Sequence, residues 1–456
     1  MNLKRDKHQK SAQAEPSTCP RGAAPASDRG GESQPAGHDN ESSGIDGLME
    51  RVVDGNNAKA ALKKVKANKG SPGSDGMTVK ELTPYLVEQW VSTRAQLLAG
   101  TYQPRPVLRQ RIPKSGGGAR ELGIPCVLDR MIQQAILQVL QPIFDPAFSE
   151  HSHGFRPGRS AHDAVCAAQR FIQDGRTWVV DVDLAAFFDR VNHDVLMERL
   201  ARKIADKRLL RLIRRYLQAP VVDGGAMVER REGTPQGGPL SPLLANVLLD
   251  EVDKELEKRG HAFARYADDC NVYVRSERAG ERVLQALREH YARLHLTVNE
   301  AKSAVARPWD RKVLGYSFWR ARDKAIKRRV APKAIQAMKE RVRQITRRAA
   351  GRSLPAVIEK LRSFLLGWRE YFRLADTPGI FERLDGWIRR RLRALQLKQW
   401  RNSPTIYREL CTRGLDRTRA SWVAANGRRW WSNAKVVAQA LPNSLYAKMG
   451  LPSLAP

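Results

Sequence analysis

The chain has 456 residues, 42% of them apolar, which is enough for two or three domains and excludes a small disulfide-stapled scaffold. Its 80 Lys and Arg outnumber 48 Asp and Glu, giving a formal net charge of +32, so a polyanion is the expected partner. The charge is uneven, because residues 311–456 hold 34 Lys and Arg against 9 Asp and Glu, a balance of +25. The five Cys lack the spacing of a zinc ribbon.

Residues 1–45 consist mainly of Gly, Ser, Pro, Ala, Gln and charged residues. Such a segment has too little apolar surface to offset the entropy of ordering, so we expect a disordered tail. No segment of the chain is continuously apolar over the length of a secretory signal or a membrane span. We therefore expect a cytoplasmic protein without membrane association.

Residues 107–125 predict a β-hairpin, because aliphatic and β-branched residues flank a flexible run of Ser and Gly. Lys114 and Arg120 lie on either side of this run. An ammonium and a guanidinium on such a hairpin can close over the phosphates of a nucleotide and neutralise charge there. A basic hairpin that is only solvated is the alternative.

A second basic motif precedes a predicted helix. Ser160 with Asp163 three residues later is typical of a capping box, and Arg156 and Arg159 come just before it. The two guanidinium groups and the helix amides can together hold a phosphate. Pairing of the arginines with Asp residues of the chain is an equally good interpretation.

Residues 178–184 alternate with a period of two, which predicts a strand. One side of this strand carries Asp181 and Asp183, and the other side is apolar. Two carboxylates on one face of a strand are candidates for a metal site.

Two further short strands, residues 262–266 and 271–274, enclose a turn with adjacent Asp268 and Asp269. Magnesium-type ions prefer oxygen ligands and keep several waters, so Asp residues from separate strands form a site that substrate phosphates can complete. A pair of such ions supports the in-line displacement of nucleotidyl transfer. An Asp pair in a turn is also common for local hydrogen-bonding reasons.

Between these strands, residues 233–242 form a Gly- and Pro-rich loop that leads into a helix capped near Ser241. Gln236 lies in this loop and is followed by two glycines, which let the backbone approach a ligand closely. We interpret the loop as a nucleotide contact, with a simple turn before the helix as the alternative.

Beyond Ile326 the sequence predicts basic amphipathic helices that form a small bundle. The collective charge favours RNA, since each phosphate contact releases counterions and adds affinity without demanding precise geometry. Arg428 and Arg429 precede Trp430 and Trp431, and this segment either stacks on and pairs with nucleic acid or closes a small core.

Taken in order, these blocks resemble the group II intron-encoded reverse transcriptases with maturase activity. The resemblance extends from about Leu48 to the C-terminus and is closest to the bacterial class without an endonuclease domain. It implies an α+β right-hand polymerase, in which fingers and a palm with an antiparallel sheet are followed by an α-helical thumb or maturase domain. The implied regions are a tail (1–45), fingers (46–170), palm (171–320), thumb or maturase domain (321–405) and a basic DNA-binding region (406–456).

The resemblance also assigns catalytic roles. Asp183 would be the first metal ligand, Asp268 the second, and Asp269 its neighbour, holding two Mg²⁺ ions for which Mn²⁺ can substitute. Asp181 is the rival of Asp183, which is preferred because the family places an aromatic five residues after the metal-binding Asp. That residue is Phe188, the candidate gate for the sugar 2′-position, with Phe187 as the alternative gate or a core residue.

Other site residues follow from the same resemblance. Lys114, Arg120 and Gln236 would contact the incoming nucleotide, and Lys302 would either donate a proton to pyrophosphate or pair with the catalytic acids. Tyr266 would pack near the primer end or in the core. The residues expected to contact nucleic acid are Arg156, Arg159, Tyr266, Arg369, Arg428 and Arg429.

The function implied is an RNA-directed DNA polymerase that binds its parent intron RNA, assists its splicing and copies it during mobility. Its partners would be an RNA template, a DNA primer and dNTPs, and dimerisation stays open. One alternative is a non-catalytic RNA-binding splicing factor with a retained polymerase fold, which the intact acids argue against. Another is a reverse transcriptase of a bacterial defence or diversity-generating system, which the thumb motif disfavours.

Overall fold

The computed structural model describes residues 45–113, 119–347 and 351–455. The tail expected over residues 1–45, except for Ile45, and Lys114 of the basic hairpin lie outside the described residues. None of the helices in the described ranges is long and apolar enough to cross a lipid bilayer.

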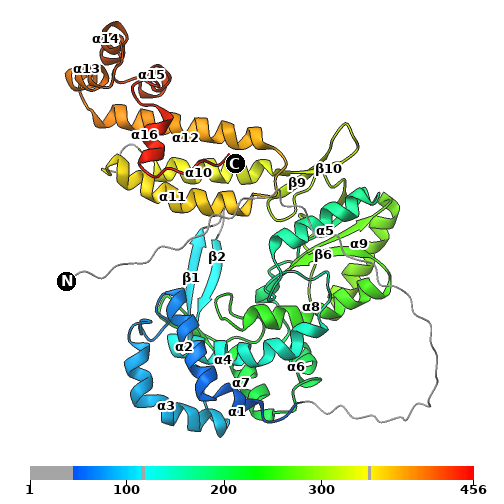
Figure 1. Cartoon of the computed structure of the whole chain (residues 1–456). Coiled ribbons are helices and arrows are strands. Elements are labelled where there is room, and N and C mark those ends of the chain that lie inside the picture. Colours follow the sequence, from blue (N-terminus) through cyan, green and yellow to red (C-terminus); the bar gives the residue numbers. More distant parts are fainter. Residues whose placement is uncertain (1–44, 114–118, 348–350, 456) are drawn as a thin grey trace. The chain divides into compact units, whose positions relative to one another are not determined.

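The first part of the chain is mainly helical and carries the predicted hairpin (Figure 1). Residues 107–113 and 119–124 pair antiparallel, with Ile112 opposite Arg120, which confirms the hairpin. The elements are α1 (Leu48–Val52), α2 (Gly55–Asn68), α3 (Leu82–Leu98), β1 (Val107–Pro113), β2 (Ala119–Ile124), α4 (Val127–Phe144), η1 (Asp145–Ala147) and α5 (Ala161–Gln173).

The middle of the chain alternates strands and helices. Its elements are β3 (Trp178–Val182), η2 (Phe187–Asp189), α6 (His193–Ala201), α7 (Lys207–Gln218), β4 (Val221–Asp223), β5 (Ala226–Val228), α8 (Ser241–Lys258), β6 (Ala262–Tyr266), β7 (Asp269–Val274), α9 (Glu277–Arg293) and β8 (Ala304–Ala306). Strand β1 pairs parallel with β4, which extends the first hairpin into a sheet of order β2-β1-β4-β5.

We call the sheet of order β6-β7-β3-β8 the palm sheet, and all of its strand pairs are antiparallel. Both of its faces are covered, because strand side chains alternate between them. Val180, Val182 and Val272 pack in one hydrophobic core with α8 and α9, whereas Val179 and Tyr273 pack in a second core with α5. The period-two pattern of residues 178–184 therefore predicted the strand correctly.

The last part of the chain is helical except for one hairpin. Its elements are β9 (Tyr316–Arg320), β10 (Ile326–Val330), α10 (Pro332–Ile345), α11 (Leu354–Tyr371), α12 (Pro378–Gln399), α13 (Ser403–Thr412), α14 (Arg417–Ala425), α15 (Trp430–Val436) and α16 (Asn443–Lys448). The apolar stripes of the three longest helices converge in the second core, which confirms the predicted bundle.

The prediction of helix from Ile326 onward is wrong for its first residues. Residues 326–330 form β10, which pairs antiparallel with β9. Ile326, Arg328 and Val330 are buried on one side, and the Arg328 guanidinium forms an ion pair of 3.1 Å with Asp376. The buried face of the strand therefore reads apolar, arginine, apolar in the sequence. This arginine breaks the alternation of apolar and polar residues by which a strand is predicted.

Candidate active site

The adjacent aspartates lie where β6 turns into β7. Tyr266 pairs with Asp269, so Ala267 and Asp268 alone form the turn. Ala267 has a φ of 58°, in the left-handed region, which costs an alanine about 1–2 kcal/mol. Neighbouring residues must therefore hold this turn in place.

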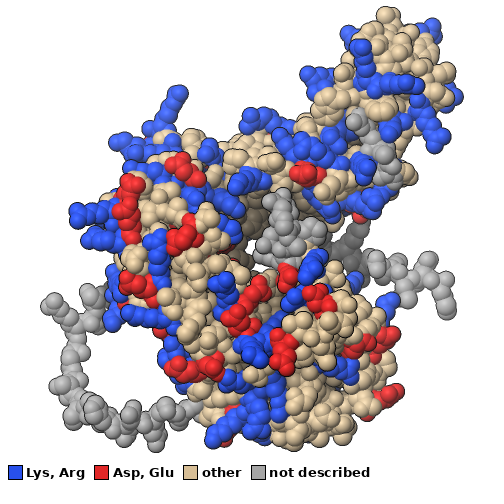
Figure 2. Space-filling model, turned by 180° about the vertical axis from the view of Figure 1, so that it is seen from behind, with Lys and Arg blue, Asp and Glu red and all other residues tan. Residues whose placement is uncertain are grey.

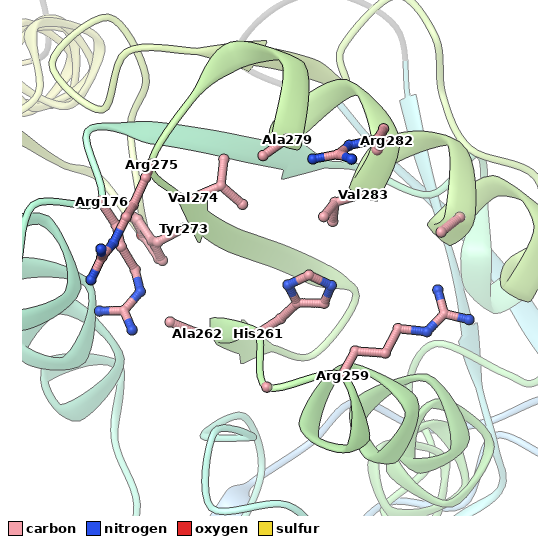
Figure 3. Close-up of a pocket in the computed structure, with 12 residues that line it drawn as sticks. Arg176, Arg259, His261, Ala262, Tyr273, Val274, Arg275, Ala279, Arg282 and Val283 are labelled. Carbon is pink, nitrogen blue, oxygen red and sulfur yellow. The ribbon is translucent and has the colours of Figure 1, made fainter.

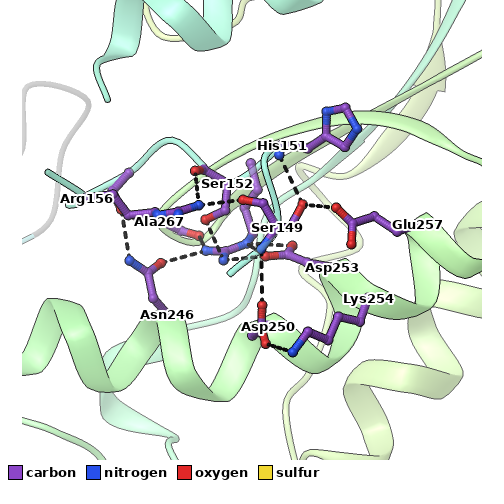
Figure 4. Close-up of polar contacts among 12 residues, drawn as sticks. Ser149, His151, Ser152, Arg156, Asn246, Asp250, Asp253, Lys254, Glu257 and Ala267 are labelled. Carbon is purple, nitrogen blue, oxygen red and sulfur yellow. Dashed lines mark hydrogen bonds and ion pairs between the residues drawn. The ribbon is translucent and has the colours of Figure 1, made fainter. Parts of the chain in front are cut away.

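A buried polar network, which the sequence did not indicate, holds the turn (Figure 4). Arg265 is 1% exposed, and its guanidinium donates to the Ala267 carbonyl oxygen at 2.8 Å. The same guanidinium donates to the Asp253 carboxylate of α8 at 2.8 Å. Asp253 is fully buried, so water does not compete for this contact. Asn246 links the other side, accepting from Arg265 and donating to the Gly154 carbonyl oxygen.

Gly154 completes this support because it lies directly against the turn. A Cβ at position 154 would lie 2.3 Å from the Ala267 backbone nitrogen, which is too close for any side chain. The loop before α5 therefore fixes the turn from one side and Arg265 fixes it from the other.

The palm sheet brings the carboxylates of β3 and β7 to one face. Asp181 lies opposite Asn271 and Val182 opposite Cys270, so the next residues, Asp183 and Asp269, meet at the same edge. Asp181, Asp183 and Asp269 line a common cavity of about 810 Å³.

These carboxylates influence one another electrostatically. Desolvation, together with repulsion from the neighbouring Asp268, Asp183 and Asp181, raises the pKa of Asp269 to about 6. Accumulated negative charge of this kind fits the binding of a cation. However, no group of three or more His, Cys, Asp or Glu in the described part of the chain is already arranged around a metal position.

Each aspartate of β3 has a cationic partner. Lys302 Nζ lies 2.9 Å from Asp183 Oδ2, whereas Arg311 lies 2.8 Å from Asp181 Oδ2. Asp183 is further held by its backbone, whose nitrogen donates to the Ser303 hydroxyl at 3.0 Å. Of the two roles considered for Lys302, the pairing role is the one that this ion pair fits.

The two candidates for the sugar gate differ in burial. Phe187 is 2% exposed and belongs to the core beneath the palm sheet, while Phe188 is only partly buried. The Phe188 carbonyl oxygen accepts from Thr234 at 2.6 Å, which ties this residue to the loop that carries Gln236. Phe188 is thus the more accessible of the two rings.

The loop of Gln236 also lies against the basic hairpin. A Cβ at position 237 would be 2.4 Å from the Gly123 carbonyl oxygen of β2, so only glycine allows this approach. Arg120 lies on the same strand three residues before Gly123. Gln236 itself, between the contacts of Thr234 and Gly237 in the chain, is half-buried.

The first of the expected nucleic-acid contacts, Arg156, is corrected by the structure. Its side chain is 4% exposed, forms an ion pair of 2.9 Å with Asp145, and donates to the Ser152 carbonyl oxygen. It therefore holds the loop before α5 and has no surface for RNA, as the alternative of intramolecular pairing stated. Arg159 is half-buried and donates to the Glu150 carbonyl oxygen.

Tyr266 lies at the surface rather than in the core. It is half-buried, and its ring centroid lies 6.1 Å from that of Phe155. Phe155 is 51% exposed and has a φ of 57°, an unusual conformation for an aromatic residue. This aromatic pair beside the turn was missed in the sequence, although the aromatic residue before Arg156 was a visible signal.

The remaining expected contacts lie in the last part of the chain. Arg369 is exposed and donates to the Ser453 carbonyl oxygen at 3.1 Å. Arg428 and Arg429 are exposed just before α15. The Trp431 ring, 37% exposed, stacks on the Arg390 guanidinium at 4.0 Å, so it does not close a core.

Comparisons with known proteins agree with this arrangement. Residues 112–318 match the family described as Reverse transcriptase (RNA-dependent DNA polymerase), whose members use divalent metal ions. Residues 335–413 match the family described as Group II intron, maturase-specific domain.

Individual relatives point in the same direction. Protein YkfC of Escherichia coli K12 is 41% identical over 193 residues, which are 41% of this chain and 51% of YkfC. The group II intron-encoded protein LtrA of Lactococcus lactis is 42% identical over 156 residues, 34% of this chain and 26% of LtrA. The chain thus spans about half the length of YkfC and about a quarter of LtrA.

Among solved structures, a chain of the "Partial Cas6-RT-Cas1--Cas2 complex" superposes with a TM-score of 0.35 and 27% identity, covering 54% of this chain and 42% of that one. Both family matches occur in one chain, in the order reverse transcriptase then maturase-specific domain. The protein therefore belongs to the group II intron reverse transcriptase and maturase family.

Proposed function

We propose that the protein is an RNA-directed DNA polymerase encoded by a group II intron, which also binds that intron's RNA, assists its splicing and copies it into DNA. The observation that carries the proposal is the meeting of Asp183 and Asp269 at one edge of the palm sheet, beside the braced turn that holds Asp268. The loop with Gln236 lies next to Phe188, because the Thr234 nitrogen donates to the Phe188 carbonyl oxygen.

In this proposal Asp183 and Asp268 hold two Mg²⁺ ions, with Mn²⁺ as a substitute, and Asp269 is their neighbour. When bound, the ions promote attack of the primer 3′-hydroxyl on the α-phosphate of a dNTP and stabilise the departing pyrophosphate. Desolvation and then repulsion from the other aspartates raise the pKa of Asp269, and this supports the assignment because a bound cation would relieve the repulsion.

The chain's own residues would bind and select the nucleotide. Gln236 contacts the bound dNTP and Phe188 excludes a 2′-hydroxyl by occupying its space. Lys114 and Arg120 of the hairpin neutralise the phosphates. Lys302, whose ammonium already lies in the cavity of the acids, holds the Asp183 carboxylate in position.

The RNA-binding part of the proposal is supported by charge. We assign residues 46–170 to fingers, 171–320 to a palm, 321–405 to a thumb or maturase domain and 406–456 to a DNA-binding region. Figure 2 shows Lys and Arg side chains spread over much of the visible surface, and residues 311–456 alone carry a balance of +25. Exposed residues such as Arg369, Arg428 and Arg429 supply sequence-independent phosphate contacts.

Primer extension tests the proposal. Purified protein with Mg²⁺ should extend a DNA oligonucleotide on an RNA template, and Asp268→Asn should abolish extension while RNA affinity stays within about two-fold, since one phosphate contact or fewer is affected. A folded wild-type protein that makes no cDNA on any primed RNA would refute the polymerase.

A further inference from the structure

A second cavity lies at the end of the palm sheet opposite the turn with Asp268. It has a volume of about 470 Å³ and lies where β6 begins and β7 ends, between the end of α8 and the start of α9. Strand β6 runs five residues from this cavity to Tyr266, which corresponds to about 15 Å at the usual rise per residue. A nucleotide at the catalytic carboxylates therefore cannot occupy this cavity at the same time.

The charged side chains that line this cavity are all of one sign. Figure 3 shows Arg176 and Arg275 on one side, Arg259 and His261 on the other, and Arg282 on the helix above. No carboxylate is among the lining residues in the described part of the chain. The catalytic cavity, by contrast, mixes aspartates with its lysines and arginines, and a third cavity beside α8 mixes glutamates with its cations.

The arginines of this cavity differ in whether their side chains have an acidic partner within the chain. Arg176 lies 3.6 Å from Asp174 and Arg259 lies 2.8 Å from Glu255, so these two are partly neutralised. Arg275 and Arg282 are exposed, and their side chains make no hydrogen bond, ion pair or ring contact with any residue that the structure describes. Arg275 lies just before Ser276, the N-cap of α9, where the helix dipole disfavours positive charge, and Arg282 lies in the second turn of this helix.

The walls of the cavity suit an extended anionic chain. Its floor is built from small apolar residues, including Ala262, Val274 and Ala279, which leave the arginine groups projecting from the rim. Guanidinium groups bind phosphate oxygens in a bidentate manner. The arginines come from three separate segments around the hollow, and such a rim can engage successive phosphates of one strand.

We propose that this cavity, here called the palm-end pocket, binds the phosphate backbone of structured RNA outside the template and primer. The inference deepens the proposed function, because it depends on the protein binding RNA and adds the place where that RNA is held. Backbone contacts of this kind position an RNA without reading its sequence. The palm-end pocket would let the protein hold its intron RNA while the opposite end of the same strands performs synthesis.

The test compares two charge-matched pairs of substitutions, which lie on α9 and at Arg275, two residues before that helix. Arg275→Ala/Arg282→Ala empties the palm-end pocket of its unpaired cations. Arg278→Ala/Arg293→Ala removes two exposed arginines of the same helix that do not line it. Affinity for a labelled RNA hairpin is measured by fluorescence anisotropy over a range of salt concentrations.

The pocket pair should raise Kd about 20-fold at about 0.15 M salt and reduce the slope of log K against log salt by about two, because two phosphate contacts are lost. The control pair should have a clearly smaller effect on both quantities. Equal effects of the two pairs would overturn the inference. Ala279→Glu, which adds a carboxylate to the wall of the pocket, should weaken RNA binding independently of either pair.

Binding of inorganic tripolyphosphate tests whether the pocket takes a small polyphosphate ligand in place of RNA. Calorimetry can show that tripolyphosphate binds the wild-type protein but not the pocket pair. If the RNA affinity of the pocket pair is then unchanged, the pocket binds a small polyphosphate and the RNA assignment is wrong. Extension of an oligonucleotide on a primed template should stay at the wild-type rate in the pocket pair. A wild-type protein without extension activity would instead refute the proposed function and leave the binding result intact.

Discussion

Replacement of Arg265 should separate the stability of the palm from the positioning of its catalytic turn. Arg265 is 1% exposed and forms an ion pair with the fully buried Asp253. Arg265→Met leaves that carboxylate buried without a partner, which costs about 3–5 kcal/mol of unfolding free energy. The variant should therefore unfold at much lower urea concentration than the wild-type protein.

A double variant isolates the second role of the same side chain. Arg265→Met/Asp253→Leu removes both charges, and the replacement of a buried ion pair by apolar residues is often neutral or stabilising. Most of the lost stability should return. The hydrogen bond from Arg265 to the Ala267 carbonyl oxygen, a charged bond worth about 1.5–3 kcal/mol, stays absent.

The turn should then sample positions away from the catalytic geometry, and kcat for primer extension should stay about ten-fold or more below the wild-type value. Urea unfolding followed by tryptophan fluorescence gives the stability, and steady-state extension on a primed RNA gives kcat. A double variant with restored stability and wild-type kcat would refute the reasoning, because the network would then hold the fold alone. RNA affinity is the control and should not change.

Three further outcomes follow from the site. The pKa of Asp269 is raised to about 6, so its carboxylate destabilises the fold as pH rises through 6. Without metal, Asp269→Asn should therefore raise the Tm above that of the wild-type protein by more at pH 8 than at pH 5. An equal Tm difference between variant and wild type at the two pH values would contradict this. Phe188→Ala should increase ribonucleotide incorporation at least about ten-fold with little loss of stability, whereas Phe187→Ala should cost about 3–5 kcal/mol of unfolding free energy; nucleotide competition assays and urea unfolding measure the two effects, and equal sugar selectivity in both variants would refute the gate. Gly154→Ala should lower kcat more than ten-fold, because the added Cβ displaces the catalytic turn. Gly367→Ala lies in open space on α11, so it should leave extension unchanged and can raise the free energy of unfolding by about 0.5–1 kcal/mol. Similar kcat values for these two variants would show that the close approach of Gly154 to the turn is unimportant.

Much of the fold was predictable because its signals are local. The alternation around Asp181 and Asp183 follows from strand geometry, and the Ser160 capping box needs only residues three apart. The contacts that define the site are not local. Whether Arg156 faces RNA or Asp145 depends on a loop that returns to η1, and the sequence alone left both possibilities open.

The brace of the catalytic turn was missed for the same reason. Arg265 and Asp253 are ordinary polar residues in the sequence, and only the packing of α8 against β6 buries them together. The hairpin of β9 and β10 was missed because Arg328 hides the apolar alternation, and its partner Asp376 is distant in the chain.

The central claim is that Asp183 and Asp268, rather than Asp181, form the catalytic centre. Asp181 is paired with Arg311, and burial raises its pKa, whereas Asp183 lies at the edge where β7 begins. Single-turnover extension of one nucleotide with Asp181→Asn, Asp183→Asn and Asp268→Asn tests this claim most directly. Asp181→Asn should keep activity within about ten-fold of the wild-type rate while the other two lose all detectable extension. Full activity in Asp183→Asn or Asp268→Asn, or equal loss in all three, would contradict the account.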